Sequence, residues 1–407
     1  MRVLIGAYAC EPGRGSEPAA GWEFVRLAAE RHQVWVLTRA NNRAPIEAGR
    51  DAAGLAGVRF VYLDLPPLAR RLKRMPYGTQ VYYLAWQLLA GREAVRLHRA
   101  VRFDLVHHVT LAVDWMPAGV LAVAGVPAVW GPVGGATGMP WVLWRWLGGR
   151  GLLREVCRAG LTGPMRTAFG RRAARRADVV VAQNGEVAAA FRRWSRHLVV
   201  EPNVAVEPAA VVPAAGAPAA GPPAGTPAAV PAGTPGRTAL FVGRLIPHKG
   251  LRLAIAALAE PAAAGWRLRV IGDGPERAGA ERLARRLGVR GRVQFAGALP
   301  RATVLTALCT ADALLAPSMY EGSGFAVAEA VAAGCPVVCT DRGGPALLVS
   351  PGAGIRVPVT RAVVRDLAAA LAGLGGRVPP SPRWSAERLR ATLPRLYELA
   401  ATARTGC

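Results

Sequence analysis

Two glutamates, Glu321 and Glu329, lie on either side of a glycine-rich turn in the segment Tyr-Glu-Gly-Ser-Gly-Phe-Ala-Val-Ala-Glu, residues 320–329. The turn follows an apolar strand pattern at 312–318 and opens a pattern typical of a helix that ends at Gly334. The free N–H groups and the dipole at such a helix start favour an anion. Two acceptor groups beside an anion site indicate a polyhydroxylated phosphate ester, which is the chemistry of a nucleotide sugar. An ordinary αβ repeat with surface glutamates is the alternative.

A second segment, residues 241–250, places a guanidinium and an ammonium, Arg244 and Lys249, between a strand pattern and a helix pattern. The planar fork of arginine and the mobile point charge of lysine together suit a diphosphate. Lysine occurs in this chain only at positions 73 and 249, so Lys249 stands out against a background of arginine. A third turn, residues 269–276, supplies Gly272 and Gly274, which are weak evidence by themselves.

Together these segments resemble retaining glycosyltransferases of family 4, the group 1 glycosyl transferases, whose two Rossmann-like domains form the GT-B fold. The resemblance covers most of the chain and is most specific over residues 238–349. Residues 11–18, Glu-Pro-Gly-Arg-Gly-Ser-Glu-Pro, resemble the N-terminal glycine loop of that family. Residues 104–108, Asp-Leu-Val-His-His, resemble its histidine-bearing strand end. Leu347 departs from the pattern, because relatives often carry a glutamate there.

The resemblance implies specific roles. Arg244 and Lys249 would bind the donor diphosphate, Glu329 would bind the ribose hydroxyls, and Glu321 with the backbone of 322–325 would contact the transferred sugar. The implied catalytic set is His107, Arg244, Lys249 and Glu321. The implied donor-binding set is Gly13, Gly15, Gly243, Arg244, Lys249, Gly272, Gly274, Glu321, Gly322, Ser323, Gly324, Phe325 and Glu329.

Less chemistry follows directly from the N-terminal residues. The glycine loop permits a close approach to a ligand, and Ser16 is predicted to cap a helix that begins near Glu17. His107 and His108 end a strand pattern, so their side chains should point to opposite faces and only one should face the sugar. The position of His107, three residues after Asp104, favours His107 by resemblance.

The surrounding elements predict an α/β protein with two doubly wound parallel sheets that face each other across a cleft. A chain of 407 residues with 52% hydrophobic residues supplies two cores. Strand patterns alternate with helix patterns in both halves, which is typical of parallel sheets. The strand patterns lie at 2–9, 33–38, 59–64, 105–110 and 179–183, and at 238–242, 268–272, 293–296, 313–316 and 337–340. The predicted domains are 1–206 on the acceptor side, an Ala/Pro/Gly-rich flexible linker at 207–236, a nucleotide-sugar domain at 237–380, and a C-terminal helix at 381–407 that crosses back to the first domain.

The formal net charge is +25, which suits a nucleic-acid partner in principle. The arginines are spread along the chain and no nucleic-acid motif is present, so we expect no specific nucleic acid. Two basic aromatic segments, 68–86 and 141–154, suit a membrane interface, with helix packing as the alternative. No apolar run is long enough to span a bilayer and no signal-peptide pattern begins the chain. We therefore expect a cytoplasmic protein, with peripheral attachment at the inner face of the membrane as the open alternative.

The sequence thus favours a metal-independent enzyme that moves a sugar from a nucleoside-diphosphate sugar with retention at the anomeric carbon. No cofactor and no metal are expected, since there is no Asp-x-Asp motif and no zinc-like cysteine spacing. The acceptor stays open between a lipid-linked or cell-envelope glycan and a small metabolite, and no oligomeric state is predicted. The alternatives are a nucleotide-sugar epimerase, a phosphorylase on a related fold, or a basic membrane- or nucleic-acid-binding protein with a degenerate donor site.

Overall fold

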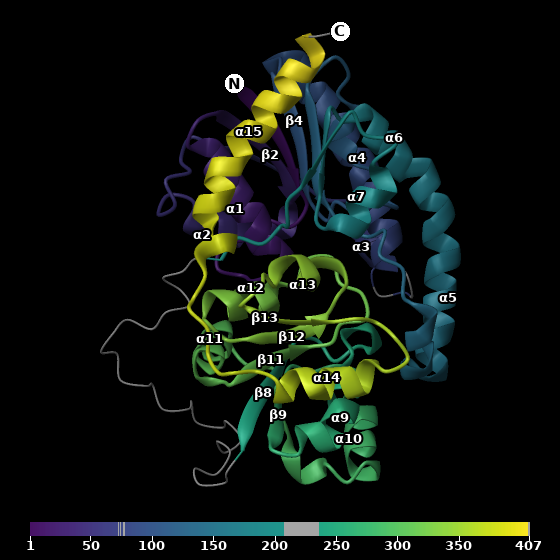
Figure 1. Cartoon of the computed structure of the whole chain (residues 1–407). Helices are drawn as coiled ribbons and strands as arrows, with labels where there is room; N and C mark the ends of the chain where they lie inside the picture. The colour runs from purple at the N-terminus through teal and green to yellow at the C-terminus, as the bar shows by residue number, and fades with distance from the viewer. Residues whose placement is uncertain (72, 74, 76–77, 207–235, 406–407) are drawn as a thin grey trace. The chain divides into compact units, whose positions relative to one another are not determined.

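The computed structural model describes residues 1–405 except 72, 74, 76–77 and 207–235 (Figure 1). The predicted linker at 207–236 therefore lies outside the described residues apart from Gly236. The chain forms two compact units. The first unit contains residues 1–136, 158–205 and 386–407, and the second contains 137–157 and 206–385.

The first unit is built on a parallel sheet that has seven strands among the described residues. In spatial order these are β3 (Arg59–Leu63), β2 (Gln33–Arg39), β1 (Arg2–Ala7), β4 (Leu105–Thr110), β5 (Ala128–Val133), β6 (Val179–Ala182) and β7 (His197–Val200). Its helices are α1 (Glu17–Ala29), α2 (Arg43–Gly49), α3 (Pro67–Arg71), α4 (Gly78–Val101), α6 (Arg171–Arg176), α7 (Gly185–Phe191) and α15 (Ala386–Thr405), with short turns η1 (Ala40–Asn42), η3 (Gly119–Ala122) and the π-helical η5 (Arg166–Gly170).

The central strands of this sheet are buried on both faces, as strand β4 shows over its whole length. One face packs against α1 and the C-terminal helix α15, whose Leu389, Leu393 and Tyr397 join the same core cluster as Phe24. The other face packs against α4, η3 and α7, in a cluster that contains Trp86 and Phe191. Residues from the far C-terminus thus complete the core of the N-terminal unit.

The second unit is built on a parallel sheet that has six strands among the described residues. Their order is β10 (Val293–Gly297), β9 (Trp266–Ile271), β8 (Arg237–Val242), β11 (Ala313–Ala316), β12 (Val337–Thr340) and β13 (Gly354–Val357). Its helices are α9 (Leu251–Ala259), α10 (Arg277–Arg286), α11 (Arg301–Thr310), α12 (Phe325–Ala332), α13 (Gly343–Leu348) and α14 (Val363–Ala372), with short turns η4 (Trp141–Trp146), η6 (Pro247–Lys249), η7 (Pro261–Ala263), η8 (Arg290–Arg292) and η9 (Pro382–Trp384).

A segment from the first half of the chain belongs to this second unit. Leu143 and Leu147, in and just after η4, are buried in the same cluster as Leu251 of α9 and Phe241 of β8. Helix α5 (Gly148–Met165) begins in that segment and continues into the first unit. The expected N-terminal domain, residues 1–206, includes 137–157, because nothing in the local sequence of this segment distinguishes it.

The predicted fold class, α/β with two doubly wound parallel sheets, is confirmed by the pairing of the strands. Three strands, β5, β7 and β13, were not predicted. Strand β5 contains Gly131 and Pro132, and both residue types lower the propensity for a strand. Strands β7 and β13 are four residues long, which is too short for a clear alternating pattern.

Candidate functional site

The turns predicted to carry chemistry follow three neighbouring strands, β9, β8 and β11, at their carboxyl ends. Backbone hydrogen bonds join these turns. The amide of Leu245 donates to the carbonyl of Asp273 at 2.9 Å, and the amide of Met319 donates to the carbonyl of His248 at 2.8 Å. Because parallel strands place such turns at one edge of a sheet, the second unit brings its predicted donor-site residues together.

Gly272 shows why glycine is needed where these turns meet. Its φ is +139°, and a Cβ at this position would lie 1.9 Å from the carbonyl oxygen of Gly243. Only a residue without a side chain lets the two backbones approach so closely. The structure therefore gives Gly272 a role in packing the turn after β9 against the turn after β8, independent of any ligand.

Lys249 and Glu321 come from different predicted motifs and form an ion pair, with Nζ and Oε1 2.5 Å apart. The hydroxyl of Ser318 donates to the other carboxylate oxygen at 2.7 Å, and the hydroxyl of Thr340 donates to the carbonyl of Ser318 at 2.7 Å. Burial acts to raise the pKa of Glu321. The Lys249 charge and the hydrogen bonds from Lys249 and Ser318 outweigh it, so the pKa is lowered. Glu321 is thus an oriented, ionised carboxylate.

A neutral aromatic pair lies next to this ion pair. The rings of His248 and Tyr320 stack with their centroids 4.5 Å apart and an interplanar angle of 15°. Burial, and then the positive charges of Lys249 and Arg244, lower the pKa of His248 to about 4. The imidazole is therefore uncharged at neutral pH and leaves the two cations as the local positive charges.

Arg244 differs from its neighbours because its side chain is exposed and pairs with no described carboxylate. It sits in the turn directly after β8, close enough to His248 for its charge to act on that ring. A guanidinium that is exposed and pairs with no carboxylate in the described part of the chain can donate its hydrogen bonds to a phosphate.

The helix after β11 also begins as predicted. Gly324 adopts a left-handed conformation with φ of 83° and precedes the first residue of α12, Phe325. The amide of Gly344, in α13, donates to the carbonyl of Glu321 at 2.9 Å and so fixes the preceding turn. Leu347, the residue that departs from the family pattern, lies in the same short helix α13.

Glu329 is held by a residue that the sequence analysis missed. The Nε of Arg301, at the start of α11, lies 2.9 Å from Oε1 of Glu329. Burial raises the pKa of Glu329, and the Arg301 charge only partly offsets that effect. Ser318, three residues before Glu321, could have been found from the strand-to-turn pattern. Arg301 could not, because an isolated arginine in an arginine-rich chain carries no local signal.

In the first unit, the predicted glycine loop with Gly13 and Gly15 precedes α1, and Gly13 adopts a positive φ of 70°. The prediction that Ser16 caps this helix is wrong, because its side chain makes no capping hydrogen bond. Ser16 itself has a φ of 68°, which non-glycine residues rarely adopt. The helix start is instead organised by the backbone, with the amide of Ala20 donating to the carbonyl of Ser16.

The two histidines of β4 point to opposite faces, as expected from strand geometry. His107 is fully buried beside Phe24, with Nδ1 3.1 Å from the hydroxyl of Tyr397 and Nε2 2.8 Å from the carbonyl oxygen of Gly131. Both ring nitrogens are thus occupied inside the first unit. This corrects the expectation that His107 presents its ring to a sugar, and we leave His107 out of the site. His108, on the other face, is equally enclosed.

The aromatic part of the first basic segment is also internal. Tyr82, Tyr83 and Trp86 are buried, and Trp86 Nε1 donates to the carbonyl of Leu63 at 3.1 Å. These rings therefore pack in the core and not at an interface, contrary to the membrane interpretation, because α4 turns them towards the sheet. Tyr77 lies outside the described residues.

The second basic segment does expose aromatic surface. Trp141 and Trp144 are 65% and 42% exposed, whereas Leu143 between them is buried. Among the described residues no helix has the length and hydrophobicity needed to cross a bilayer. The same residues contain no group of three His, Cys, Asp or Glu side chains placed to hold a metal ion.

Comparisons with known proteins agree with this description. Residues 228–374 match the family described as glycosyl transferases group 1. A 2-deoxystreptamine glucosyltransferase of Streptomyces kanamyceticus is 39% identical over 123 residues, which are 28% of this chain and 32% of that relative. The lipopolysaccharide core biosynthesis glycosyltransferase LpsE of Rhizobium meliloti is 35% identical over 31% of this chain and 34% of its own length. The chain thus matches about a third of the length of these curated relatives.

Solved structures extend the likeness of the fold to the whole chain. Sucrose-phosphate synthase from Thermosynechococcus elongatus superposes with a TM-score of 0.61 at 18% identity, covering 98% of this chain and 96% of that one. The HepE protein of Anabaena in complex with UDP superposes with a TM-score of 0.58 at 16% identity, covering both chains completely. The predicted GT-B fold is confirmed by these neighbours. Over residues 228–374, which include every predicted donor-site residue of the second unit, the chain matches the group 1 glycosyl transferases.

Proposed function

We propose that this protein is a retaining glycosyltransferase of family 4 that moves a sugar from a nucleoside-diphosphate sugar to an acceptor. One observation carries the proposal. The second unit places the ion pair of Lys249 and Glu321 beside an exposed guanidinium, Arg244, and beside the start of α12. Two cations for a diphosphate and two oriented carboxylates for hydroxyl groups are thus positioned on one edge of one sheet.

The reaction breaks the bond between the anomeric carbon and the phosphate oxygen, and its electron pair leaves with the nucleoside diphosphate. The acceptor oxygen forms the new bond to the anomeric carbon on the same face, and the leaving phosphate takes the acceptor's proton. The main task of the protein is then to stabilise negative charge on the leaving group, which Arg244 and Lys249 are placed to do. No protein base is required.

Recognition of the donor is assigned to the carboxylates. Glu321 and the backbone of residues 322–325 would contact the transferred sugar, and Glu329 would accept hydrogen bonds from the ribose. Since Glu329 is paired with Arg301, the ribose would share that carboxylate or displace the arginine. Because the positive charge comes from side chains and a helix start, we propose that no metal is needed.

The relatives support a nucleotide donor and leave two kinds of acceptor open. The HepE protein has been solved with UDP and with UDP-glucose. Two relatives are named for a substrate or a pathway. One is a 2-deoxystreptamine glucosyltransferase, and the other is a glycosyltransferase of lipopolysaccharide core biosynthesis. We propose an acceptor that is a cell-envelope or lipid-linked glycan or a small metabolite. The exposed Trp141 and Trp144 support peripheral attachment of a cytoplasmic enzyme to a membrane.

The test is turnover of a panel of UDP-, GDP- and ADP-sugars by the whole chain with glycan and aminocyclitol acceptors. Release of the nucleoside diphosphate is measured, and proton NMR of the product gives the anomeric configuration. We expect one donor to be consumed, retention of configuration, and unchanged rates after chelation of divalent ions. A product of inverted configuration would contradict the retaining mechanism. Binding of no nucleoside diphosphate would contradict the proposal as a whole.

A further inference from the structure

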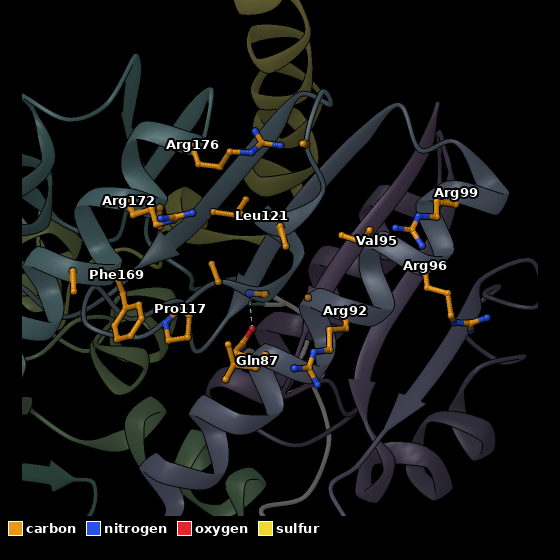
Figure 2. A pocket seen from close by; sticks show the side chains of 18 residues that line it. Gln87, Arg92, Val95, Arg96, Arg99, Pro117, Leu121, Phe169, Arg172 and Arg176 are labelled. Carbon is orange, nitrogen blue, oxygen red and sulfur yellow. Dashed lines mark hydrogen bonds between the residues drawn. The ribbon is translucent and has the colours of Figure 1, made fainter.

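The first unit contains a cavity of about 1050 Å³ that none of the predicted site residues lines. It lies between helix α4, the segment around η3, and the helices η5 and α6 (Figure 2). Figure 2 shows Arg92, Arg96 and Arg99 along α4, with Arg172 and Arg176 on the opposite side of the cavity. Two rows of arginine thus border one hollow.

Most of this positive charge is not neutralised by the protein. Arg96 forms an ion pair with Glu93 at 2.5 Å. Arg176 donates hydrogen bonds to backbone carbonyls, including that of Val126. The others make neither a hydrogen bond nor an ion pair with any described residue. They are Arg92, Arg99 and Arg172. Guanidinium groups that border one hollow without a described carboxylate partner favour an anion such as a phosphate, which accepts bidentate hydrogen bonds from arginine.

The floor of the same cavity is apolar. Val95 of α4, Leu121 of η3 and Phe169 of η5 contribute hydrocarbon surface to it. Phe169 is presented by a π-helical turn, Arg166–Gly170, and such turns are frequent at functional sites. An inorganic ion alone would leave this apolar surface exposed to water, so the lining fits a ligand with an apolar part.

A buried amide forms part of the cavity wall. Gln87 is 2% exposed and lines the cavity, and its Oε1 accepts from the amide of Gly119 at 2.8 Å. The hydroxyl of Tyr83 lies near this amide and donates to the carbonyl of Leu111 at 2.8 Å. The Gln87 side chain thus joins α4 to the segment that carries η3.

We propose that this cavity binds an anionic amphiphile, a phosphate ester that carries a hydrocarbon chain. The phosphate binds at the arginine-lined border, and the hydrocarbon chain covers the apolar floor. The volume suits one small molecule. The ligand reaches the site either as a dispersed monomer or out of a bilayer, and both sources share this chemistry.

The probe is dihexanoyl phosphatidic acid below its micelle concentration, titrated into the full chain by calorimetry. Dihexanoyl phosphatidylcholine and inorganic phosphate are the comparison ligands, and both should bind at least tenfold more weakly. The lining variant Arg92→Gln/Arg99→Gln/Arg172→Gln should lose at least tenfold in affinity for phosphatidic acid. The control variant Arg282→Gln/Arg285→Gln/Arg286→Gln removes the same charge from the exposed surface of α10 and should bind as the parent does.

Equal binding by the lining and control variants would overturn the proposal. So would equal affinity for inorganic phosphate or for a glutamate-rich peptide. Sedimentation with phosphatidylglycerol vesicles, without binding of the dispersed lipid, would also overturn it, because a surface and not the cavity would then be the receptor. Sedimentation that the lining variant abolishes would identify the bilayer as a source.

Discussion

Lys249 and Glu321 form an ion pair that organises the candidate site of the second unit. Each was predicted separately, one as a phosphate ligand and the other as a sugar ligand, and the structure joins them at 2.5 Å. A lysine shared between a carboxylate and an incoming diphosphate would couple donor binding to the position of Glu321. The pair also holds that carboxylate ionised.

Lys249→Met should destabilise the second unit, because it leaves a largely buried carboxylate without its cation. We expect a loss of about 1–3 kcal/mol in unfolding free energy, measured by urea denaturation. The double variant Lys249→Met/Glu321→Gln should recover part of the loss, since the orphaned charge is then gone. If the double variant loses as much as the two single variants added together, the pair is not coupled.

The two carboxylates should have different ligand preferences. Glu329→Gln should weaken nucleoside and nucleoside diphosphate alike by about 1.5–3 kcal/mol, because the ribose is common to both. Glu321→Gln should weaken the intact nucleotide sugar more than the nucleoside diphosphate. Calorimetric titration of each variant with all three ligands separates these patterns. The opposite order, with Glu329→Gln selective for the sugar, would exchange the two assignments.

For single residues, the sequence predicted those of the site in the second unit because each of them follows a strand within a short motif. It did not predict Arg301 or the stack of His248 on Tyr320, because these contacts join separate motifs. It assigned His107 by resemblance, and the structure encloses that ring between Phe24 and Tyr397. Local spacing can place a residue at a strand end, but it cannot show what packs over that residue.

Several arginines act as structural parts of the helices and strands. Arg292, in η8, donates to the carbonyls of Ala263 at 2.9 Å, Trp266 at 3.2 Å and Leu258 at 2.7 Å. These carbonyls come from the end of α9, the η7 turn and the first residue of β9. A single guanidinium therefore satisfies backbone acceptors that the helix end leaves free.

Arg292→Met should keep much of the aliphatic packing and remove these charge-assisted hydrogen bonds. We expect it to destabilise the second unit by roughly 2–3 kcal/mol. Arg286→Met, at an exposed position in α10, is the matched control and should change stability by less than about 0.5 kcal/mol. Urea unfolding of both variants measures the difference. Equal stabilities would mean that water satisfies the carbonyls as well as Arg292 does.

The elements with a continuous apolar run, such as β6 and β11, were predicted with nearly the observed bounds. The segment 137–157 was not assigned to its unit, because membership depends on Leu143 and Leu147 being buried among residues some hundred positions later. Sequence patterns of one segment contain no information on which core it joins. The domain boundaries expected from sequence and the compact units consequently differ at 137–157.

Over the whole molecule, the charge of +25 serves several purposes that composition alone does not separate. Arg292 satisfies backbone groups, Arg301 orients a carboxylate, Arg244 is available to a phosphate, and Arg92 faces the cavity of the first unit. A basic composition was first compatible with a nucleic-acid partner. The placement of these side chains favours small phosphorylated ligands instead.

Buried histidines should make the protein sensitive to acid. Burial, and then the nearby His107, lower the pKa of His108 from 6.5 to about 3. Between these values the unfolded chain binds a proton that the folded chain does not, so stability is complete above pH 6.5 and falls as the pH drops towards 3. His108→Gln removes this contribution. We expect the parent to lose more unfolding free energy than His108→Gln between pH 7.5 and pH 5, and equal losses would contradict the enclosed, neutral state of His108.

The central claim is that the second unit binds the diphosphate of a nucleotide sugar through Arg244 and Lys249. The most direct measurement is calorimetric titration of UDP, GDP and ADP into the parent and into Arg244→Ala, a variant of an exposed residue whose melting temperature should not change. We expect at least one nucleoside diphosphate to bind the parent, and Arg244→Ala to weaken it by about 1.5–3 kcal/mol, roughly ten- to a hundredfold in Kd. Binding of that nucleoside diphosphate to Arg244→Ala as tightly as to the parent would contradict the assignment of the site.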